Sequence, residues 1–85
     1  MEKFNGKIKE YYDNGILKFE GSFLNDEKNG KGREYSNGSL NFEGEYLNGE
    51  RWNGKGKEYN GNGELIYEGK YLNGEKTIRT FVNFF

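Results

Sequence analysis

A repeat of about 24 residues is the feature that most limits how this 85-residue chain can fold. Tyr11, Tyr35 and Tyr59 recur at intervals of 24 residues, and a Glu precedes each of them. Three aromatic-Glu-Gly triplets recur with a similar spacing, at 19–21, 42–44 and 67–69. Periods of roughly 20–50 residues are typical of proteins in which each unit packs only against its neighbours. We therefore interpret residues 1–85 as one repeat domain, with units at about 5–20 (partial), 20–43, 43–68 and 68–85.

Asn-Gly dipeptides separate the apolar segments of the repeat, and nine of them occur, beginning at positions 5, 14, 29, 37, 48, 53, 60, 62 and 73. Both residues tolerate positive φ, which the type I′ turn of a tight β-hairpin requires. Between these turns the apolar residues alternate, as they do along Leu40, Phe42, Gly44 and Tyr46, and a period of two indicates a strand. No segment has helical spacing. The sequence therefore predicts an all-β, single-layer antiparallel meander with strands at 6–12, 17–24, 31–36, 40–47, 54–59, 64–72 and 77–84.

Glycines inside these predicted strands suggest how the aromatic rings pack. We expect Gly21 to lie opposite Gly32 and Gly44 to lie opposite Gly56, because rings could then lie flat over the neighbouring bare backbone. This register also pairs Phe23 with Gly30, Tyr46 with Gly54, Glu20 with Arg33, Glu43 with Lys57 and Glu45 with Lys55. The hairpin after 43–47 is one residue longer than the one before it, so we expect a bulge in the register.

The recurring pattern is aromatic-Glu-Gly-x-aromatic-x-Asn-Gly, as at 42–49, followed by Gly-Lys-Gly-x-x-Tyr, as at 30–35. Over residues 5–76 it resembles the MORN repeat (membrane occupation and recognition nexus). The resemblance implies an elongated, twisted sheet of stacked hairpins with aromatic residues along one groove. It also implies a protein-binding scaffold, in a family whose arrays self-associate in several cases and have been proposed to bind acidic phospholipids.

Aromatic residues are the first candidate site. We predict a groove for a protein or peptide partner lined by Phe19, Phe23, Phe42, Tyr46, Trp52, Tyr67 and Tyr71. The alternative is that these rings are simply the core, since no helix is available to cover them. Trp52, expected in a loop, is either an exposed anchor for a partner or a ring folded back over its hairpin.

Basic residues are the second candidate site, since Lys7, Lys9, Lys31, Arg33, Lys55 and Lys57 recur at strand spacing. Such a row favours an anionic ligand, above all an acidic membrane lipid. The alternative is that Glu20, Glu43 and Glu45 neutralise the row across the strands. We interpret Tyr11, Tyr35 and Tyr59 as packing residues near strand ends.

Composition excludes several classes of site. The chain has no Cys and no His, which excludes thiolate nucleophiles, imidazole bases and Cys- or His-ligated metals. A net charge of −1 argues against nucleic-acid binding. We therefore expect no enzyme activity, no cofactor and no metal site. The N-terminal residues lack the apolar stretch of a signal peptide, so we expect a cytoplasmic chain, at the inner face of a membrane or on the cytoskeleton.

Open strands at both ends of a meander invite pairing with another chain. We therefore expect that the protein can form homo-oligomers through its edge strands. The apolar segment 81–85 is the candidate for a dimer contact, and the alternative is that it caps the last hairpin within the chain.

Overall fold

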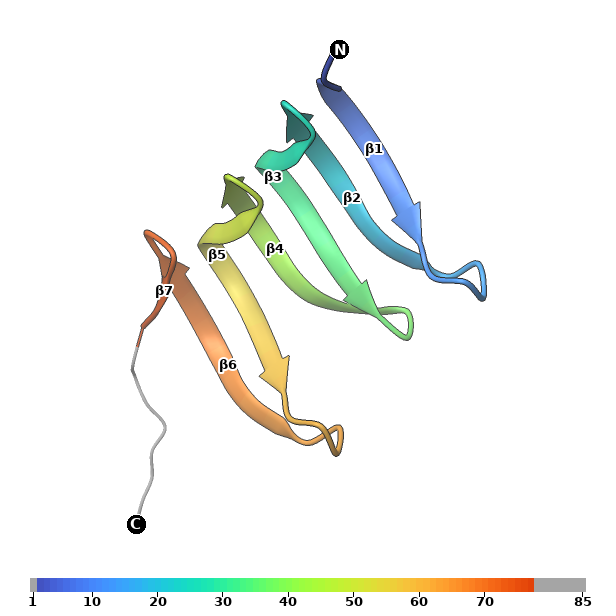
Figure 1. The fold of residues 1–85 in the computed structure, drawn as a ribbon. Helices are drawn as coiled ribbons and strands as arrows, with labels where there is room; N and C mark the ends of the chain where they lie inside the picture. Colours follow the sequence, from blue (N-terminus) through green and yellow to red (C-terminus); the bar gives the residue numbers. More distant parts are fainter. Residues whose placement is uncertain (1, 78–85) are drawn as a thin grey trace.

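The computed structural model describes residues 2–77 and contains a single antiparallel sheet, shown in Figure 1. Its strands are β1 (Gly6–Tyr11), β2 (Leu17–Leu24), β3 (Glu27–Ser36), β4 (Ser39–Leu47), β5 (Glu50–Tyr59), β6 (Leu65–Leu72) and β7 (Glu75–Lys76). Each strand pairs with the next one along the chain, in the order β1 to β7. The predicted all-β meander is therefore confirmed. No helix occurs in the described residues, so none there could cross a bilayer.

The seventh strand begins earlier than predicted. β7 occupies Glu75–Lys76, where Tyr71 pairs with Lys76 and Leu72 pairs with Glu75. Thr77 follows the strand, and its backbone N–H donates to the carbonyl of Lys70 at 2.9 Å. The remainder of the predicted strand, 78–84, and the apolar segment 81–85 lie outside the described residues.

Four hairpins close through two-residue turns, which are Asn25-Asp26, Asn37-Gly38, Asn48-Gly49 and Asn73-Gly74. Every residue in these turns has a positive φ, between 51° and 87°. This is the conformation of the type I′ turn, whose twist matches that of the flanking strands. Because these turns are so short, β3 and β5 begin about four residues earlier than the sequence predicts.

Neighbouring hairpins are joined through three of these turns. The N–H of Asp26 donates to the carbonyl of Phe4, that of Gly49 to Lys28, and that of Gly74 to Trp52, over 2.9–3.0 Å. Two asparagine side chains add to this contact, since the Asn5 amide oxygen accepts from the N–H of Asn25 and the Asn53 oxygen accepts from that of Asn73. Each of these turns is therefore held by residues at the start of the preceding odd-numbered strand, or just before it, as well as by its own hairpin.

The predicted register is confirmed in the first full hairpin and wrong in the second. Gly21 lies opposite Gly32 and Glu20 opposite Arg33, as expected, although Phe23 pairs with Lys28 instead of Gly30. In the second hairpin Gly44 lies opposite Gly54, so Glu43 meets Lys55, Glu45 meets Asn53 and Tyr46 meets Arg51.

A difference in the size of the bulge explains this error. In the first hairpin the pairing passes from Phe23 with Lys28 to Gly21 with Gly32, so β3 has two more residues than β2 between these pairs. In the second hairpin only Trp52 is left unpaired, between Arg51 and Asn53. Because the bulge is smaller in β5, Gly54 rather than Gly56 lies opposite Gly44.

A second set of bulges changes the face on which three leucines lie. Leu17, Leu40 and Leu65 pair with Tyr11, Tyr35 and Tyr59, and each pair follows a break in the register. The sequence predicts these leucines on the same face as the rings. One extra residue in each strand moves them off that face, and Leu40 and Leu65 are 42% and 50% exposed.

Aromatic rings form the core, as a continuous row across the sheet that we call the ring ladder. Its members, in spatial order, are Phe4, Phe23, Phe19, Tyr46, Phe42, Tyr71 and Tyr67. Each ring meets the next one edge to face, with centroids 5.2–6.4 Å apart. Pairs of this geometry contribute about 0.5–1.5 kcal/mol beyond the burial of their area. The hairpins are therefore held together through their rings as well as through the strand hydrogen bonds.

Glycines provide the space for these rings, as the sequence predicts. A Cβ atom on Gly32 would lie 2.9 Å from the ring of Phe19 and 3.0 Å from the ring of Tyr46. A Cβ atom on Gly56 would lie 2.8 Å from Phe42 and 3.0 Å from Tyr71. The two positions are equivalent in successive repeats, so each of these buried rings lies against bare backbone on a neighbouring strand.

We expect Gly32→Ala to lower the free energy of unfolding by about 1–3 kcal/mol, because the added methyl group forces the rings of Phe19 and Tyr46 out of place. Urea unfolding followed by Trp52 fluorescence measures this change. Gly61→Ala is the control, since nothing lies within 4 Å of a Cβ atom there and the φ of Gly61 is not positive. Equal losses of stability in the two variants would contradict the role assigned to Gly32.

Candidate functional site

The ring ladder is closed to solvent at its centre. Phe19 and Phe42 are 0% exposed, and Tyr46 and Tyr71 are 4% and 6% exposed. Phe23 and Tyr67 are partly buried against these four. The structure therefore supports the interpretation that these rings are the core of the protein. A partner cannot contact Phe19 or Phe42 directly, because neither has accessible surface.

Basic side chains cover the ladder in place of a second layer of secondary structure. The Lys28 ammonium nitrogen lies 4.5 Å from the centroid of the Phe19 ring. The Arg51 guanidinium carbon lies 4.8 Å from Phe42 and 5.2 Å from Tyr71. Cation–π contacts of this kind contribute about 0.5–2 kcal/mol each. Lys76 repeats the arrangement over the ring of Tyr67, at 5.5 Å.

Sequence reasoning missed these three basic residues, although a signal was present. Each is the fourth residue of an Asn-x-Glu-Lys/Arg segment, at 25–28, 48–51 and 73–76. The two-residue turn at the start of each segment directs the basic side chain back over a ring of its own hairpin, and Lys28 and Arg51 also cover a ring of the next one. The pattern predicts the turns, but it does not show on which face of the sheet the basic side chains after each turn lie.

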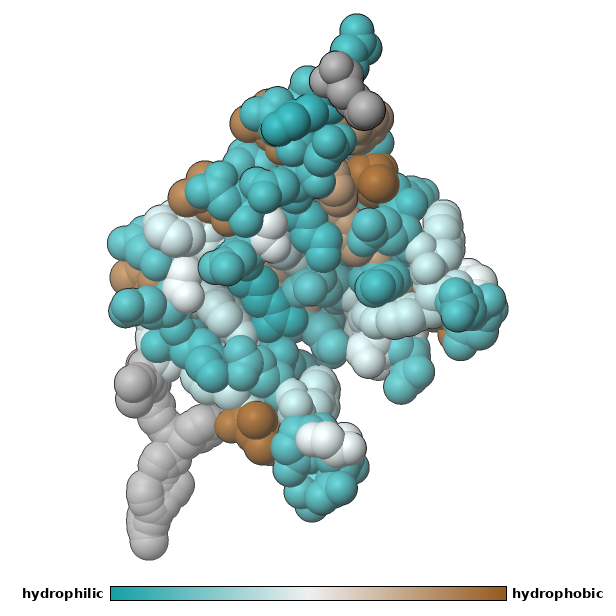
Figure 2. All heavy atoms as spheres, viewed as in Figure 1, coloured by the Kyte–Doolittle hydropathy of each residue, from teal (hydrophilic) through white to brown (hydrophobic). Residues whose placement is uncertain are grey.

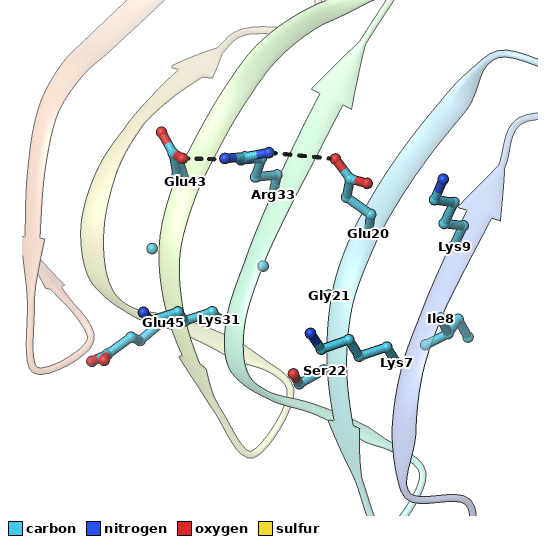
Figure 3. Close-up of a pocket in the computed structure, with 12 residues that line it drawn as sticks. Lys7, Ile8, Lys9, Glu20, Gly21, Ser22, Lys31, Arg33, Glu43 and Glu45 are labelled. Atoms are coloured by element: carbon cyan, nitrogen blue, oxygen red, sulfur yellow. Dashed lines mark hydrogen bonds and ion pairs between the residues drawn. The ribbon is translucent and has the colours of Figure 1, made fainter.

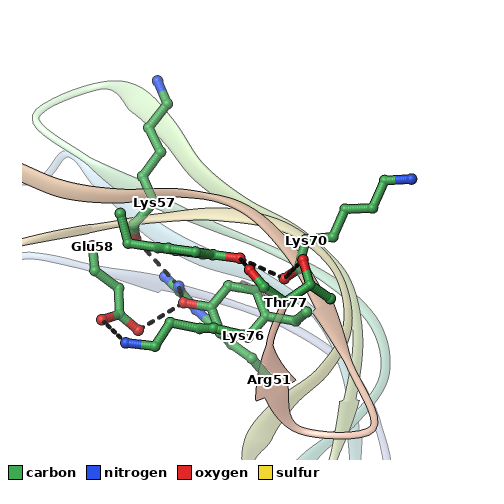
Figure 4. Close-up of polar contacts among 8 residues, drawn as sticks. Arg51, Lys57, Glu58, Lys70, Lys76 and Thr77 are labelled. Atoms are coloured by element: carbon green, nitrogen blue, oxygen red, sulfur yellow. Dashed lines mark hydrogen bonds and ion pairs between the residues drawn. The ribbon is translucent and has the colours of Figure 1, made fainter. Parts of the chain in front are cut away.

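Carboxylates and tyrosine hydroxyls complete this cover (Figure 4). Arg51 donates to Glu34 at 2.6 Å and to the hydroxyl of Tyr71 at 2.8 Å. The same hydroxyl donates to Glu58 at 2.8 Å, and Glu58 also accepts from Lys76 at 2.9 Å. The polar groups of this cluster are therefore bound to one another.

The pKa shifts in this cluster follow from burial and from these contacts. Burial, and after it the hydrogen bond to Glu58, raises the pKa of Tyr71 to about 12. Hydrogen bonds from Lys76 and Tyr71 lower the pKa of Glu58. Burial, and after it the nearby charge of Glu34, raises the pKa of Tyr46 further than that of Tyr71. The Tyr46 hydroxyl is buried and has no hydrogen-bond partner within residues 2–77.

We expect Arg51→Ala to lower the free energy of unfolding by about 1.5–3 kcal/mol, because it removes the ring cover and leaves Glu34 without its cation. Arg33→Ala is the matched control. Arg33 is also bound to glutamates, but its side chain is 51% exposed on the other face, where an ion pair contributes about 0–1 kcal/mol. Chemical unfolding of both variants tests this difference. Similar losses would show that the position of Arg51 over the rings has no special effect.

Tyr71 makes stability sensitive to alkaline pH. Its pKa is raised from 10.0 in the unfolded chain to about 12, so its contribution is fully present below pH 10 and is lost as pH rises through about 12. We expect the free energy of unfolding to fall across this interval, and less steeply in Tyr71→Phe. Unfolding curves between pH 8 and 12 test this, and identical slopes in the two proteins would contradict it.

The opposite side of the sheet carries charged residues around two hollows, and we call it the hollow face. Figure 3 shows the first of these hollows. The charged side chains of the hollow face are Lys7, Lys9, Glu20, Lys31, Arg33, Glu43, Glu45, Lys55, Lys57, Glu68 and Lys70. The hollows have volumes of about 800 and 720 Å³. All six basic residues predicted from the sequence therefore lie on one face, because side chains two apart along a strand share a side of the sheet.

Glutamates neutralise the basic residues of this face only in part. Arg33 is bound to Glu43 at 2.9 Å and approaches Glu20 at 3.7 Å. Within residues 2–77, no carboxylate lies within 4 Å of the amino groups of Lys31 and Lys55. Lys55 also lies opposite another lysine, Lys70, on the adjacent strand. With seven basic and four acidic side chains, the hollow face has an excess of three positive charges.

Of the three tyrosines that recur every 24 residues, one makes a contact within the sheet and two are exposed. Tyr35 donates its hydroxyl to Glu20 at 2.7 Å, and this bond raises the pKa of Tyr35. Tyr11 and Tyr59 are exposed.

Figure 2 shows that hydrophilic residues cover most of the visible surface, and that hydrophobic residues form separate groups on it.

Trp52 lies within β5 and not in a loop, which corrects the prediction. Its ring packs on the next turn, where a Cβ atom on Gly74 would lie 2.9 Å from the indole. Its backbone carbonyl accepts from the N–H of Gly74. Of the two interpretations of Trp52, the structure favours a ring that folds over a hairpin, although the hairpin is the following one.

Comparison with protein-family models, with curated proteins and with solved structures finds no match to this chain. The resemblance to MORN repeats therefore stays a prediction from the sequence.

No group of three or more acidic side chains that could hold a metal ion occurs in the described part of the chain.

Proposed function

We propose that this chain is a non-catalytic interaction module that binds an acidic segment of a partner protein on its hollow face. The observation that supports this most directly is the distribution of charge. The chain as a whole has a net charge of −1, yet the hollow face has an excess of three positive charges. A surface of one sign attracts a partner of the other and fixes its orientation.

The arrangement of polar groups supports binding more than catalysis. The strongest pKa shifts belong to Tyr46 and Tyr71, which lie in the buried ring ladder. A general acid or base has to reach its substrate, but the Tyr71 hydroxyl is bound to Arg51 and Glu58 and the Tyr46 hydroxyl is buried. The resemblance to MORN repeats, which implies a scaffold, supports the same function.

A protein segment suits the hollow face better than a membrane does. The basic side chains of this face alternate with Glu20, Glu43 and Glu68 and lie around hollows. A bilayer surface is flat and binds best to an uninterrupted basic cluster. A peptide can enter a hollow and place apolar side chains against Leu40, which lines the second hollow. We expect such a partner in the cytoplasm, and an acidic lipid surface is the alternative ligand.

We expect a fluorescent peptide of alternating Glu and Leu to bind the protein at low ionic strength, and added salt to weaken the binding. Fluorescence anisotropy measures it. Replacing both Lys31 and Lys55 by Gln should weaken binding about tenfold or more, since each lost charge contact contributes roughly 1 kcal/mol. Lys3→Gln with Lys18→Gln is the control, because it makes the same change of charge at residues that do not line the hollows.

Vesicles that contain phosphatidylserine distinguish the two ligands. The proposal expects the peptide to bind and the vesicles not to sediment the protein. Sedimentation that depends on Lys31 and Lys55, without peptide binding, would support the lipid instead. Equal peptide binding by the two double variants would exclude the hollow face as the site.

A further inference from the structure

The nine Asn-Gly dipeptides are chemically reactive, apart from their use as turns. The backbone nitrogen of the Gly can attack the side-chain carbonyl carbon of the Asn, because Gly has no side chain to obstruct it. A new N–C bond forms, the bond to the side-chain nitrogen breaks, and ammonia leaves with the proton of the Gly N–H. Water then opens the resulting succinimide at either carbonyl, which gives aspartate or isoaspartate. The reaction needs a Gly nitrogen and an Asn side chain that are free to approach each other.

In four dipeptides a hydrogen bond holds the Gly N–H in place. The N–H groups of Gly49 and Gly74 donate to the carbonyls of Lys28 and Trp52 on the neighbouring hairpins. Those of Gly15 and Gly63 donate to the carbonyls of Tyr12 and Asn60 within their own loops.

In three others the Asn side chain is held. The amide oxygens of Asn5 and Asn53 accept from the N–H groups of Asn25 and Asn73. That of Asn60 accepts from the N–H groups of Asn62 and Glu64. In the eighth dipeptide, Gly30 is paired with Tyr46 inside the β3–β4 ladder.

Asn37-Gly38 is different. Within residues 2–77, neither the Asn37 side chain nor the Gly38 N–H has a hydrogen-bond partner. Both residues are exposed, and nothing lies within 4 Å of the Cβ position of Gly38. The reason is its place in the sheet. The other two-residue turns contact the preceding odd-numbered strand, whereas this turn lies at the opposite end, between the loops at 12–16 and 60–64 (Figure 1).

We infer that Asn37 is a deamidation site, at which the fold leaves one Asn-Gly dipeptide open to intramolecular attack and protects the other eight. The product adds one negative charge to the turn. Where it is isoaspartate, it also adds a backbone carbon to a two-residue turn, which disturbs the pairing of Ser36 with Ser39.

Incubation of the full chain in mildly alkaline buffer, followed by peptide mapping with mass spectrometry, tests this inference. We expect the mass change from amide to acid to appear at Asn37 about tenfold faster than at Asn48 or Asn73. That ratio corresponds to about 1.4 kcal/mol for freeing one bonded N–H. In water enriched in ¹⁸O the peptide that contains Asn37 should gain the label first.

Two controls show whether the fold is responsible. In concentrated urea the nine sites should react at similar rates, because no hydrogen bond then distinguishes them. Asn37→Gln should remove the fast reaction and leave the rates at Asn48 and Asn73 unchanged. Equal rates at Asn37, Asn48 and Asn73 in the folded protein would overturn the inference, and so would a ranking that persists in urea.

Discussion

The packing of aromatic rings on bare glycine backbone is the interaction on which the rest of this structure depends. A single-layer sheet has no second layer to bury its apolar side, so its side chains have to cover one another. At Gly32 and Gly56 the missing side chains let rings from neighbouring strands approach within van der Waals distance of the backbone. The rings are then close enough to meet edge to face across hairpin boundaries. Both the stability of one hairpin and its attachment to the next therefore come from the same contacts.

Because the ladder is also covered by Lys28, Arg51 and Lys76, the two faces of the sheet take different roles. One face uses its cations to close the core, and two of them, Arg51 and Lys76, are bound to the carboxylates of Glu34 and Glu58. On the other face the cations exceed the carboxylates, and several of them have no close partner among the described residues. The charges of this second face remain available for recognition, which is why the proposed site lies there and not over the rings.

The sequence predicts the parts of this structure that depend on local rules. Asn-Gly turns and a period of two follow from the conformations that one or two residues allow. They predict the meander, and the ends of β1 to β6 to within about four residues, but they place the seventh strand after β7. The register of each hairpin depends instead on how many residues bulge from the strand after the turn, which is two in β3 and one, Trp52, in β5. The cover of the rings depends on how far the side chains of Lys28 and Arg51 reach across the sheet. The spacing of residues in the sequence does not show this reach. The basic row can be predicted from the sequence because its residues alternate along single strands.

Differences between equivalent ladder positions follow from what surrounds each ring. The first ring of each unit is Phe19, Phe42 and then Tyr67. The two phenylalanines are wholly buried between strands, where a hydroxyl would need a partner that the neighbouring rings cannot supply. Tyr67 lies on β6, beside the last strand of the described residues, and its hydroxyl donates to the carbonyl oxygens of Lys70 and Thr77, at 2.7 and 2.9 Å. The hydroxyl therefore has backbone partners at this position, so the change from Phe to Tyr fits the surroundings of each ring.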